Sequence, residues 1–185
     1  MSESKVEHPS EERFRAAFNL IEPWVEQRYG IPIRISDVPD PFTGDLDGAE
    51  IKVDHDVTAE DALFIIAHLF GHTVQWNLSE RGRTLGVQAP DPGISEERLA
   101  ELYDYEKEAA QLSLALFHEA GVDDLDQWVS DYFHCDWGYL AHYYRTGEKR
   151  PFRSFWVDGT DPIEAIEIPE FHPTCWRARS GGIVL

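Results

Sequence analysis

Residues 58–76 read TAEDALFIIAHLFGHTVQW, and the rest of the chain is best interpreted around this stretch. Between its ends it is apolar at almost every position, which is typical of a helix that is buried on all sides. Thr58, with Asp61 three residues later, resembles a capping box in which Asp replaces Glu or Gln. We therefore predict a buried helix that begins after Thr58 and ends near Asn77.

Two histidines, His68 and His72, interrupt the apolar run. Side chains four residues apart on a helix project from one face, so both imidazoles can reach the same metal ion. A buried pair of imidazoles costs free energy unless a partner satisfies it, and a metal ion is one such partner. The alternative is a pair of core histidines, each hydrogen-bonded to a backbone carbonyl or a carboxylate.

The composition indicates one globular domain and argues against several classes of function. The chain has 185 residues, of which 42% are hydrophobic, enough for a sizeable core. Its net charge of −19, from 16 basic and 35 acidic residues, argues against nucleic acid and anionic membranes as partners. No apolar run approaches the roughly 18 residues that span a bilayer, and the polar N-terminus lacks the pattern of a signal peptide. We expect a cytoplasmic protein.

The segments before the histidine helix predict a small α+β domain. Apolar residues at intervals of three and four indicate an amphipathic helix from Ser10 to about Tyr29. Alternating apolar residues indicate two short strands, at 31–36 and 49–54, which we expect to pair in antiparallel fashion. The residues between them, 37–47, are typical of a turn-rich connection.

The segments after the histidine helix predict a loop, two more helices and an extension. Glycines and prolines indicate a long surface loop at 79–94, which either rims a site or is a plain exposed loop. A helix with a leucine stripe begins at Ser95, and an unusually aromatic helix runs from about Leu125 to Tyr144. The last part, 146–185, is expected to wrap the helical body as small strands or extended cover.

Glu108 is the candidate for a third metal ligand, because it lies beside the leucine stripe, where a carboxylate without a partner is costly. The alternative is that Glu108 simply reaches solvent. Glu106 points to a different side of the helix and is a candidate catalytic base. Tyr132 and His134 of the aromatic helix are further catalytic candidates, and the aromatic side chains from Tyr132 to Tyr144 are expected to wall the pocket.

This order of elements, together with two motifs, resembles the ImmA/IrrE family of zinc-dependent metallopeptidases. HLFGH at 68–72 is similar to the HExxH motif of that family. EKEAAQLS at 106–113 is similar to the helical pattern E-x-E-A-N-x-F-A, which supplies the third zinc ligand, although Ala110 stands in place of Asn. The aromatic segment at 129–140 also resembles the helix that follows in the family, so the resemblance covers roughly residues 11–145.

The resemblance implies a zincin-like α+β fold with a short antiparallel sheet, about four helices and a loop-rich C-terminal extension. Residues 1–145 would form the metal-binding domain, with 146–185 packed onto it. His68, His72 and Glu108 would bind one divalent metal, zinc above all, with iron or manganese as alternatives. A water in the open coordination position would attack a polarised carbonyl, or a similar electrophile, of a small-molecule or peptide substrate.

One position departs from the family pattern, because Leu69 stands where the family has the glutamate that activates the water. Leucine cannot take up a proton, and loss of a general base typically costs about 10²–10⁴-fold in rate. Three interpretations follow. The chain is a metal-dependent hydrolase-like enzyme but not an ordinary peptidase, or an inactive pseudo-metallopeptidase that binds or regulates a protein partner, or a metal-free fold with structural histidines.

Overall fold

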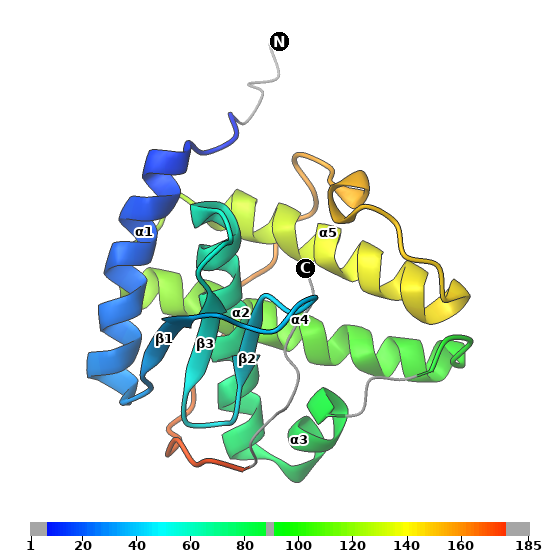
Figure 1. Cartoon of the computed structure of the whole chain (residues 1–185), viewed down its shortest axis with the longest axis horizontal. Coiled ribbons are helices and arrows are strands. Elements are labelled where there is room, and N and C mark those ends of the chain that lie inside the picture. The colour runs from blue at the N-terminus through cyan, green and yellow to red at the C-terminus, as the bar shows by residue number, and fades with distance from the viewer. Residues whose placement is uncertain (1–6, 88–90, 177–185) are drawn as a thin grey trace.

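The computed structural model describes residues 7–87 and 91–176 (Figure 1). This part of the chain is an α+β arrangement of a small sheet and several helices, which confirms the predicted class. In chain order the elements are α1 (Glu11–Trp24), the π-helix η1 (Val25–Tyr29), β1 (Ile33–Ser36), β2 (Gly44–Leu46), β3 (Ile51–Asp54), α2 (Ala59–Leu78), α3 (Glu80–Val87), α4 (Glu96–Glu119), α5 (Asp126–Thr146) and the 3-10 helix η2 (Phe152–Phe155).

Helix α2 is the centre of the molecule, as predicted. Every residue from Leu63 to Trp76 is buried, so the helix has no solvent-facing side over most of its length. The Thr58 side chain caps its first turn by accepting a hydrogen bond from the backbone N–H of Asp61 at 3.1 Å. The sheet, α1 and α4 are arranged around α2 (Figure 1).

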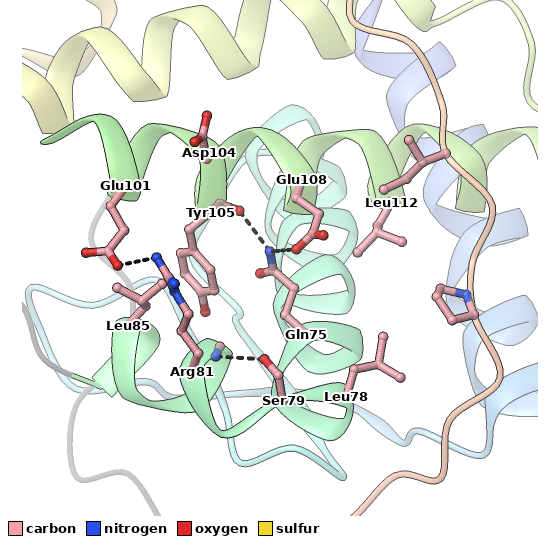
Figure 2. A pocket seen from close by; sticks show the side chains of 13 residues that line it. Gln75, Leu78, Ser79, Arg81, Leu85, Glu101, Asp104, Tyr105, Glu108 and Leu112 are labelled. Carbon is pink, nitrogen blue, oxygen red and sulfur yellow. Dashed lines mark hydrogen bonds and ion pairs between the residues drawn. The ribbon is translucent and has the colours of Figure 1, made fainter. Parts of the chain in front are cut away.

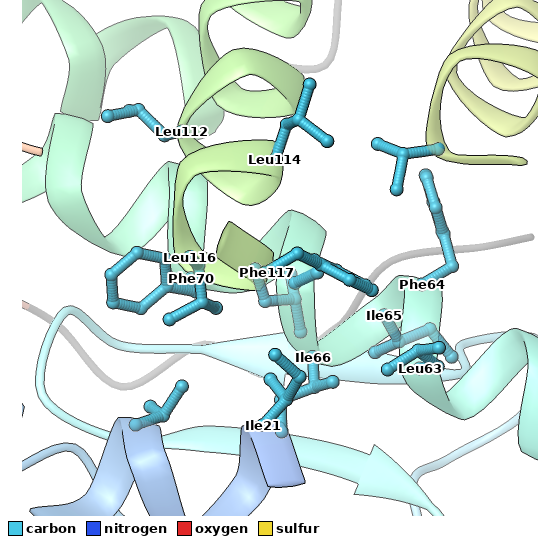
Figure 3. Close-up of a cluster of buried hydrophobic side chains, with 14 of the residues drawn as sticks. Ile21, Leu63, Phe64, Ile65, Ile66, Phe70, Leu112, Leu114, Leu116 and Phe117 are labelled. Carbon is cyan, nitrogen blue, oxygen red and sulfur yellow. The ribbon is translucent and has the colours of Figure 1, made fainter. Parts of the chain in front are cut away.

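The main hydrophobic core forms where α1, α2 and α4 meet (Figure 3). Ile21 of α1, Ile66 of α2 and Leu116 of α4 are all fully buried there. Each such side chain contributes about 1.5–3 kcal/mol to stability when it is removed from water. The helix that carries the two histidines is therefore held by core packing on several sides.

The sheet is mixed, so the prediction of an antiparallel sheet is wrong. Both predicted strands exist, but the strand order is β1-β3-β2, with β1 parallel to β3 and β2 antiparallel to β3. The missed element is β2, because a strand of three residues in a segment rich in Gly and Pro resembles a plain connection. With β2 inserted, the chain reverses twice between β1 and β3, and these two strands run in the same direction.

A helix, α3, occupies much of the segment 79–94, where a long loop was predicted. The Ser79 side chain accepts a hydrogen bond from the N–H of Gly82 at 2.9 Å. The glycine serves close packing rather than a turn, because a Cβ atom on Gly82 would lie 2.7 Å from the carbonyl oxygen of Gln75. Residues 88–90 of the predicted loop lie outside the described residues.

The two long helices downstream are confirmed close to their predicted limits. Helix α4 begins directly after Ser95, whose side chain accepts a hydrogen bond from the N–H of Arg98 at 3.2 Å. Helix α5 ends at Gly147, which adopts the left-handed conformation with φ 73° that glycine favours. Within the described ranges, no helix combines the length and the apolar character needed to cross a membrane.

The C-terminal extension follows α5 as the short helix η2 and extended backbone. Small strands or extended cover were predicted for this part of the chain. No strand is present between residues 147 and 176, so the extended cover is observed. Residues 177–185 of the predicted extension lie outside the described residues. Apolar side chains of the extension pack against the main core, namely Phe152, Trp156, Ile163, Ile166, Ile168 and Phe171.

Asn77, at the C-terminal end of α2, holds the far end of this extension. Its side-chain oxygen accepts hydrogen bonds from the backbone N–H of Thr174 at 2.9 Å and from the indole N–H of Trp176 at 3.0 Å. Its side-chain nitrogen donates to the carbonyl oxygen of Gly48, between β2 and β3, at 2.7 Å. One side chain therefore joins three segments that are far apart in the sequence.

Helices α2 and α4 approach each other closely at Gly71. A Cβ atom on Gly71 would lie 2.3 Å from the carbonyl oxygen and 2.8 Å from the Cα atom of Ala109. Ser113 Oγ donates a hydrogen bond to the carbonyl oxygen of Ala67 at 2.8 Å, so the two helices are also bonded to each other. Small side chains on both helices allow this contact between backbones.

Gly71→Ala is expected to lower the free energy of unfolding by about 1–3 kcal/mol, the usual cost of overpacking, even though alanine favours a helix. The added methyl group has no space unless α2 and α4 move apart. Chemical denaturation compares this variant with Gly138→Ala in α5, where the atoms nearest to the new Cβ belong to the Phe155 side chain, the closest at 3.3 Å. Wild-type stability of the Gly71→Ala protein would contradict this packing.

Candidate metal centre

Three side chains from α2 and α4 converge on one point. His68 and His72 project from the same face of α2, and Glu106 extends toward them from α4. The Nε2 atoms of the two histidines are 3.0 Å apart. Glu106 Oε2 lies 3.6 Å from Nε2 of His68 and 3.2 Å from Nε2 of His72. The three atoms form a nearly equilateral triangle.

The size of this triangle suits one metal ion. Zinc binds imidazole nitrogen and carboxylate oxygen at about 2.0–2.1 Å in a tetrahedron, which places two ligand atoms about 3.3–3.4 Å apart. The observed separations of 3.0, 3.2 and 3.6 Å lie on both sides of that value. The residues present therefore fit a divalent ion with three protein ligands and one further position.

Gln75 determines which nitrogen of His72 faces the triangle. The side-chain nitrogen of Gln75 donates to the carbonyl oxygen of Tyr105 at 2.9 Å and to Glu108 Oε2 at 2.6 Å. The Gln75 oxygen lies 2.8 Å from His72 Nδ1, and because this oxygen can only accept, Nδ1 is assigned the proton. In a neutral imidazole, Nε2 then presents its lone pair to the triangle, as a metal ligand must.

The cluster is nearly closed to solvent, and its electrostatics favour metal-binding forms. Side-chain exposure is 8% for His68, 5% for His72 and 13% for Glu106. Burial and the neighbouring His72 lower the pKa of His68 to about 3, so this imidazole is neutral at neutral pH. Burial alone would raise the pKa of Glu106, but positive charge on the imidazoles, His72 foremost, and a hydrogen bond from His72 bring that pKa below its ordinary value, so a cation at the cluster favours the ionised carboxylate. Neutral imidazole and ionised carboxylate are the forms that bind metals.

Aromatic rings wall the cluster, but they come mainly from the ligand-bearing helices. Phe64 stacks on His68 with ring centroids 5.1 Å apart, and Tyr105 stacks on His72 at 4.6 Å. The predicted wall was the aromatic face of α5. From that helix, Tyr144 is close enough that the charge of Glu106, after burial, helps to raise its pKa.

The third member of the cluster is Glu106, and the prediction of Glu108 is corrected accordingly. Glu108 is exposed and accepts a hydrogen bond from Gln75 instead. Two residues along a helix differ in direction by about 200°, so the two glutamates point to different sides of α4, Glu106 toward the two histidines and Glu108 toward Gln75. The overlooked signal is that Glu106, Ala110 and Ser113 share one face, on which small side chains mark the approach to another helix. Glu106, predicted as a base, thus occupies a ligand position.

Tyr132 and His134, the other predicted catalytic residues, lie outside the cluster. Tyr132 is fully buried, and its hydroxyl donates a hydrogen bond to Asp61 Oδ1 at 2.7 Å. Its ring stacks on Phe64 at 3.8 Å. His134 Nε2 lies 3.1 Å from the carbonyl oxygen of Asp161 in the extension. Tyr132 therefore joins α5 to α2, and His134 joins the extension to α5.

Leu69, between the two histidines, belongs to the contact between α2 and the sheet. It is fully buried, and its Cδ1 atom lies 3.0 Å from where a Cβ atom on Gly44 of β2 would be. Its side chain is therefore packed against a strand, and no proton-transferring group stands at this position.

Asp136 of α5 is a buried carboxyl group that the sequence patterns do not reveal. It is 5% exposed, and no hydrogen bond to its carboxyl group is present within the described ranges. Burial and the nearby charge of Glu106 raise its pKa well above the ordinary value, which favours the protonated form. A single Asp among many aromatic residues has no characteristic spacing, so the sequence offered no signal for it.

A second group of potential ligands, Asp37, Asp54 and His55, lies at the end of β3. The two oxygens of Asp54 accept hydrogen bonds from the backbone N–H groups of Val38 at 3.0 Å and Asp56 at 2.9 Å. Asp37 and His55 are exposed. This group stabilises the turns around β3 and carries no functional argument.

Comparison of the chain with protein-family models, with curated proteins and with solved structures found no match. The cluster of His68, His72 and Glu106 is the feature of the chain that points to a function.

Without metal, the protein is expected to lose stability as the pH falls below about 6.5. The fold lowers the pKa of His68 from 6.5 to about 3, so between these values the unfolded chain binds a proton that the folded chain excludes. Urea denaturation at a series of pH values measures this loss. His68→Gln should show a shallower dependence, and His172→Gln, at an exposed position, controls for removal of a histidine. If the stability of wild type and of His68→Gln falls equally steeply with pH, the lowered pKa of His68 is refuted.

Proposed function

We propose that the chain is a metal-dependent, hydrolase-like enzyme in which His68, His72 and Glu106 hold one divalent metal ion. The observation that carries this proposal is the triangle of ligand atoms with sides of 3.0, 3.2 and 3.6 Å. The His72 lone pair and the Glu106 oxygen are both acceptors, and they face each other at 3.2 Å. That arrangement is unfavourable unless a proton or a cation lies between them.

Zinc is the first expectation for this site. Two imidazoles and one carboxylate with one further position are a common ligand set of catalytic zinc. The same set also holds non-haem iron, and manganese is a further candidate. Zinc bound there would supply Lewis acidity and lower the pKa of its water ligand to about 7.

A zincin-like fold similar to that of the ImmA/IrrE family is part of this proposal. A small sheet precedes the helix with His68 and His72, and a glutamate on the next long helix completes the cluster, which is the order in that family. In the motif at 106–113, Glu106 would take the position of the third ligand. Leu69 is the departure that argues against ordinary peptide hydrolysis.

Proton transfer is assigned to Asp136 in this proposal. Its carboxyl group is buried and has no hydrogen-bond partner within the described ranges, and its pKa is raised by burial and by the charge of Glu106. A carboxyl group that is protonated before the reaction can donate its proton to a leaving group. Asp136 would act as a general acid rather than replace the glutamate missing at Leu69.

A metal-binding module without catalytic activity, which recognises a protein partner, is the second candidate. The buried Leu69 favours it, because the usual base is absent from the motif. Metal binding is common to both candidates, so turnover is the property that separates them.

Protein purified without a metal-binding tag is expected to contain close to one equivalent of zinc by plasma mass spectrometry. Glu106→Gln removes a ligand and should weaken zinc binding by at least about 10–100-fold, the loss typical of removing even an outer hydrogen-bond partner. Glu97→Gln, at an exposed position of the same helix, is the matched control and should keep the wild-type zinc content. The metal site is refuted if the wild type takes up no metal on reconstitution, or if the two variants behave alike.

The zinc-loaded protein is expected to hydrolyse members of a panel of chromogenic esters and fluorogenic peptides, with activity lost on chelation. Asp136→Asn should lower kcat by about 10²–10⁴-fold, because it removes the proton donor, while zinc content is unchanged. Asp123→Asn, at an exposed position, is the control for removal of an acidic residue. Full zinc content without turnover of any substrate would favour the binding module instead.

A further inference from the structure

A cavity of about 430 Å³ lies between α2, α3, α4 and the C-terminal extension (Figure 2). Its volume falls in the range of sites that bind small ligands. Gln75, which holds His72 through its side-chain oxygen, lines the cavity, whereas His68, His72 and Glu106 do not. The cavity is therefore a neighbour of the candidate metal centre and has its own lining.

Negative charge in this cavity is only partly neutralised. Glu101 is paired with Arg81 and Arg98. Glu108 accepts a hydrogen bond from a neutral amide at 2.6 Å, and no basic side chain within the described ranges forms an ion pair with it. Asp104, one turn earlier on α4, also lines the cavity and is exposed. Among the residues that line the cavity, the one basic side chain, Arg81, faces three carboxylates, so the lining keeps an excess of negative charge.

Much of the remaining lining is apolar. Figure 2 shows the Glu108 carboxylate turned toward Gln75, with Leu112 beside it on α4. A ligand bound to this carboxylate can therefore also contact hydrocarbon surface. The apolar side chains come from α2, α3, α4 and the extension, and they are Leu78, Leu85, Leu112, Ile166 and Pro169.

We propose that this cavity binds an organic cation, namely an ammonium group on a short aliphatic chain. The ammonium group would form charge-assisted hydrogen bonds with Glu108, and the chain would lie against Leu78 and Leu112. An anion is excluded by the charge of Glu108 and Asp104. A bare metal ion fits poorly, because the Gln75 amide already directs a hydrogen-bond donor at the same carboxylate.

Two sources can supply this chemistry, a free aliphatic amine and the lysine side chain of a peptide. The proposal does not depend on the candidate metal centre, since none of the three candidate ligands lines the cavity. Binding can therefore be measured on the full chain without metal, and again on the Glu106→Gln variant. If the metal centre is refuted, the proposed binding of a cation in the cavity is unaffected. If cation binding is refuted, the proposed metal centre is unaffected.

The test is a nuclear magnetic resonance titration of the full, metal-free chain at physiological ionic strength, with the side-chain amide signal of Gln75 as the reporter. n-Butylamine represents the free amine, and Nα-acetyl-lysine methylamide represents the peptide side chain. At least one of the two should shift the Gln75 signal in a saturable way. Glu108→Gln should weaken that binding by roughly tenfold or more, the usual effect of removing a charged hydrogen-bond partner.

Matched controls separate this site from general attraction to an acidic protein. Glu97→Gln removes one exposed carboxylate from the same helix outside the cavity and should leave the affinity unchanged. Leu78→Lys introduces a competing ammonium group into the cavity and should abolish binding. The neutral probes n-butanol and Nα-acetyl-norleucine methylamide should bind at least tenfold more weakly than the amines. The proposal is overturned if neither amine shifts the signal, if Glu97→Gln weakens binding as much as Glu108→Gln, or if the neutral probes bind equally well.

Discussion

The contact between Gly71 of α2 and Ala109 of α4 sets the distance on which the rest of the structure depends. Every residue of the candidate metal centre lies on one of these two helices, and His72 and Glu106 lie within one turn of the contact. Because the backbones touch, two side chains of moderate length can meet without a bend in either helix. The same contact between two helices therefore determines both the packing of the core and the spacing of the side chains in the candidate metal centre.

Polar groups inside such a core need defined partners, because an unpaired polar group is costly in a medium of low polarity. Gln75 meets this demand with two donated hydrogen bonds and one accepted one, and it thereby orients His72. Asp136 is 5% exposed, and no hydrogen bond to its carboxyl group is present within the described ranges. A buried group with a raised pKa beside a cluster of titratable side chains is more characteristic of a functional site than of a structural one.

The histidine helix could be predicted from the sequence alone, because an apolar run of that length has few other interpretations. The choice between Glu106 and Glu108 could not, because it depends on how α4 is rotated against α2. That rotation is determined by contacts between residues far apart in the chain, such as the bond from Ser113 to Ala67. Helix α3 was missed for a related reason: Gly82 indicated a turn locally, whereas its role is close approach to a neighbouring helix. A local sequence pattern predicts where the chain turns and which residues are buried, but it does not predict which helix or strand a buried face packs against.

The hydrogen bonds of Asn77 also constrain the order in which the molecule can be completed during synthesis on the ribosome. Asn77 emerges about a hundred residues before Trp176, the partner that its side chain binds in the finished fold. The residues of α1 through α5 all precede the extension, so the helical core can assemble first. Ile166 and Pro169, which close one side of the cavity beside α3, arrive later. A nascent chain can therefore contain all three residues of the histidine–glutamate cluster before Ile166 and Pro169 complete the lining of the cavity.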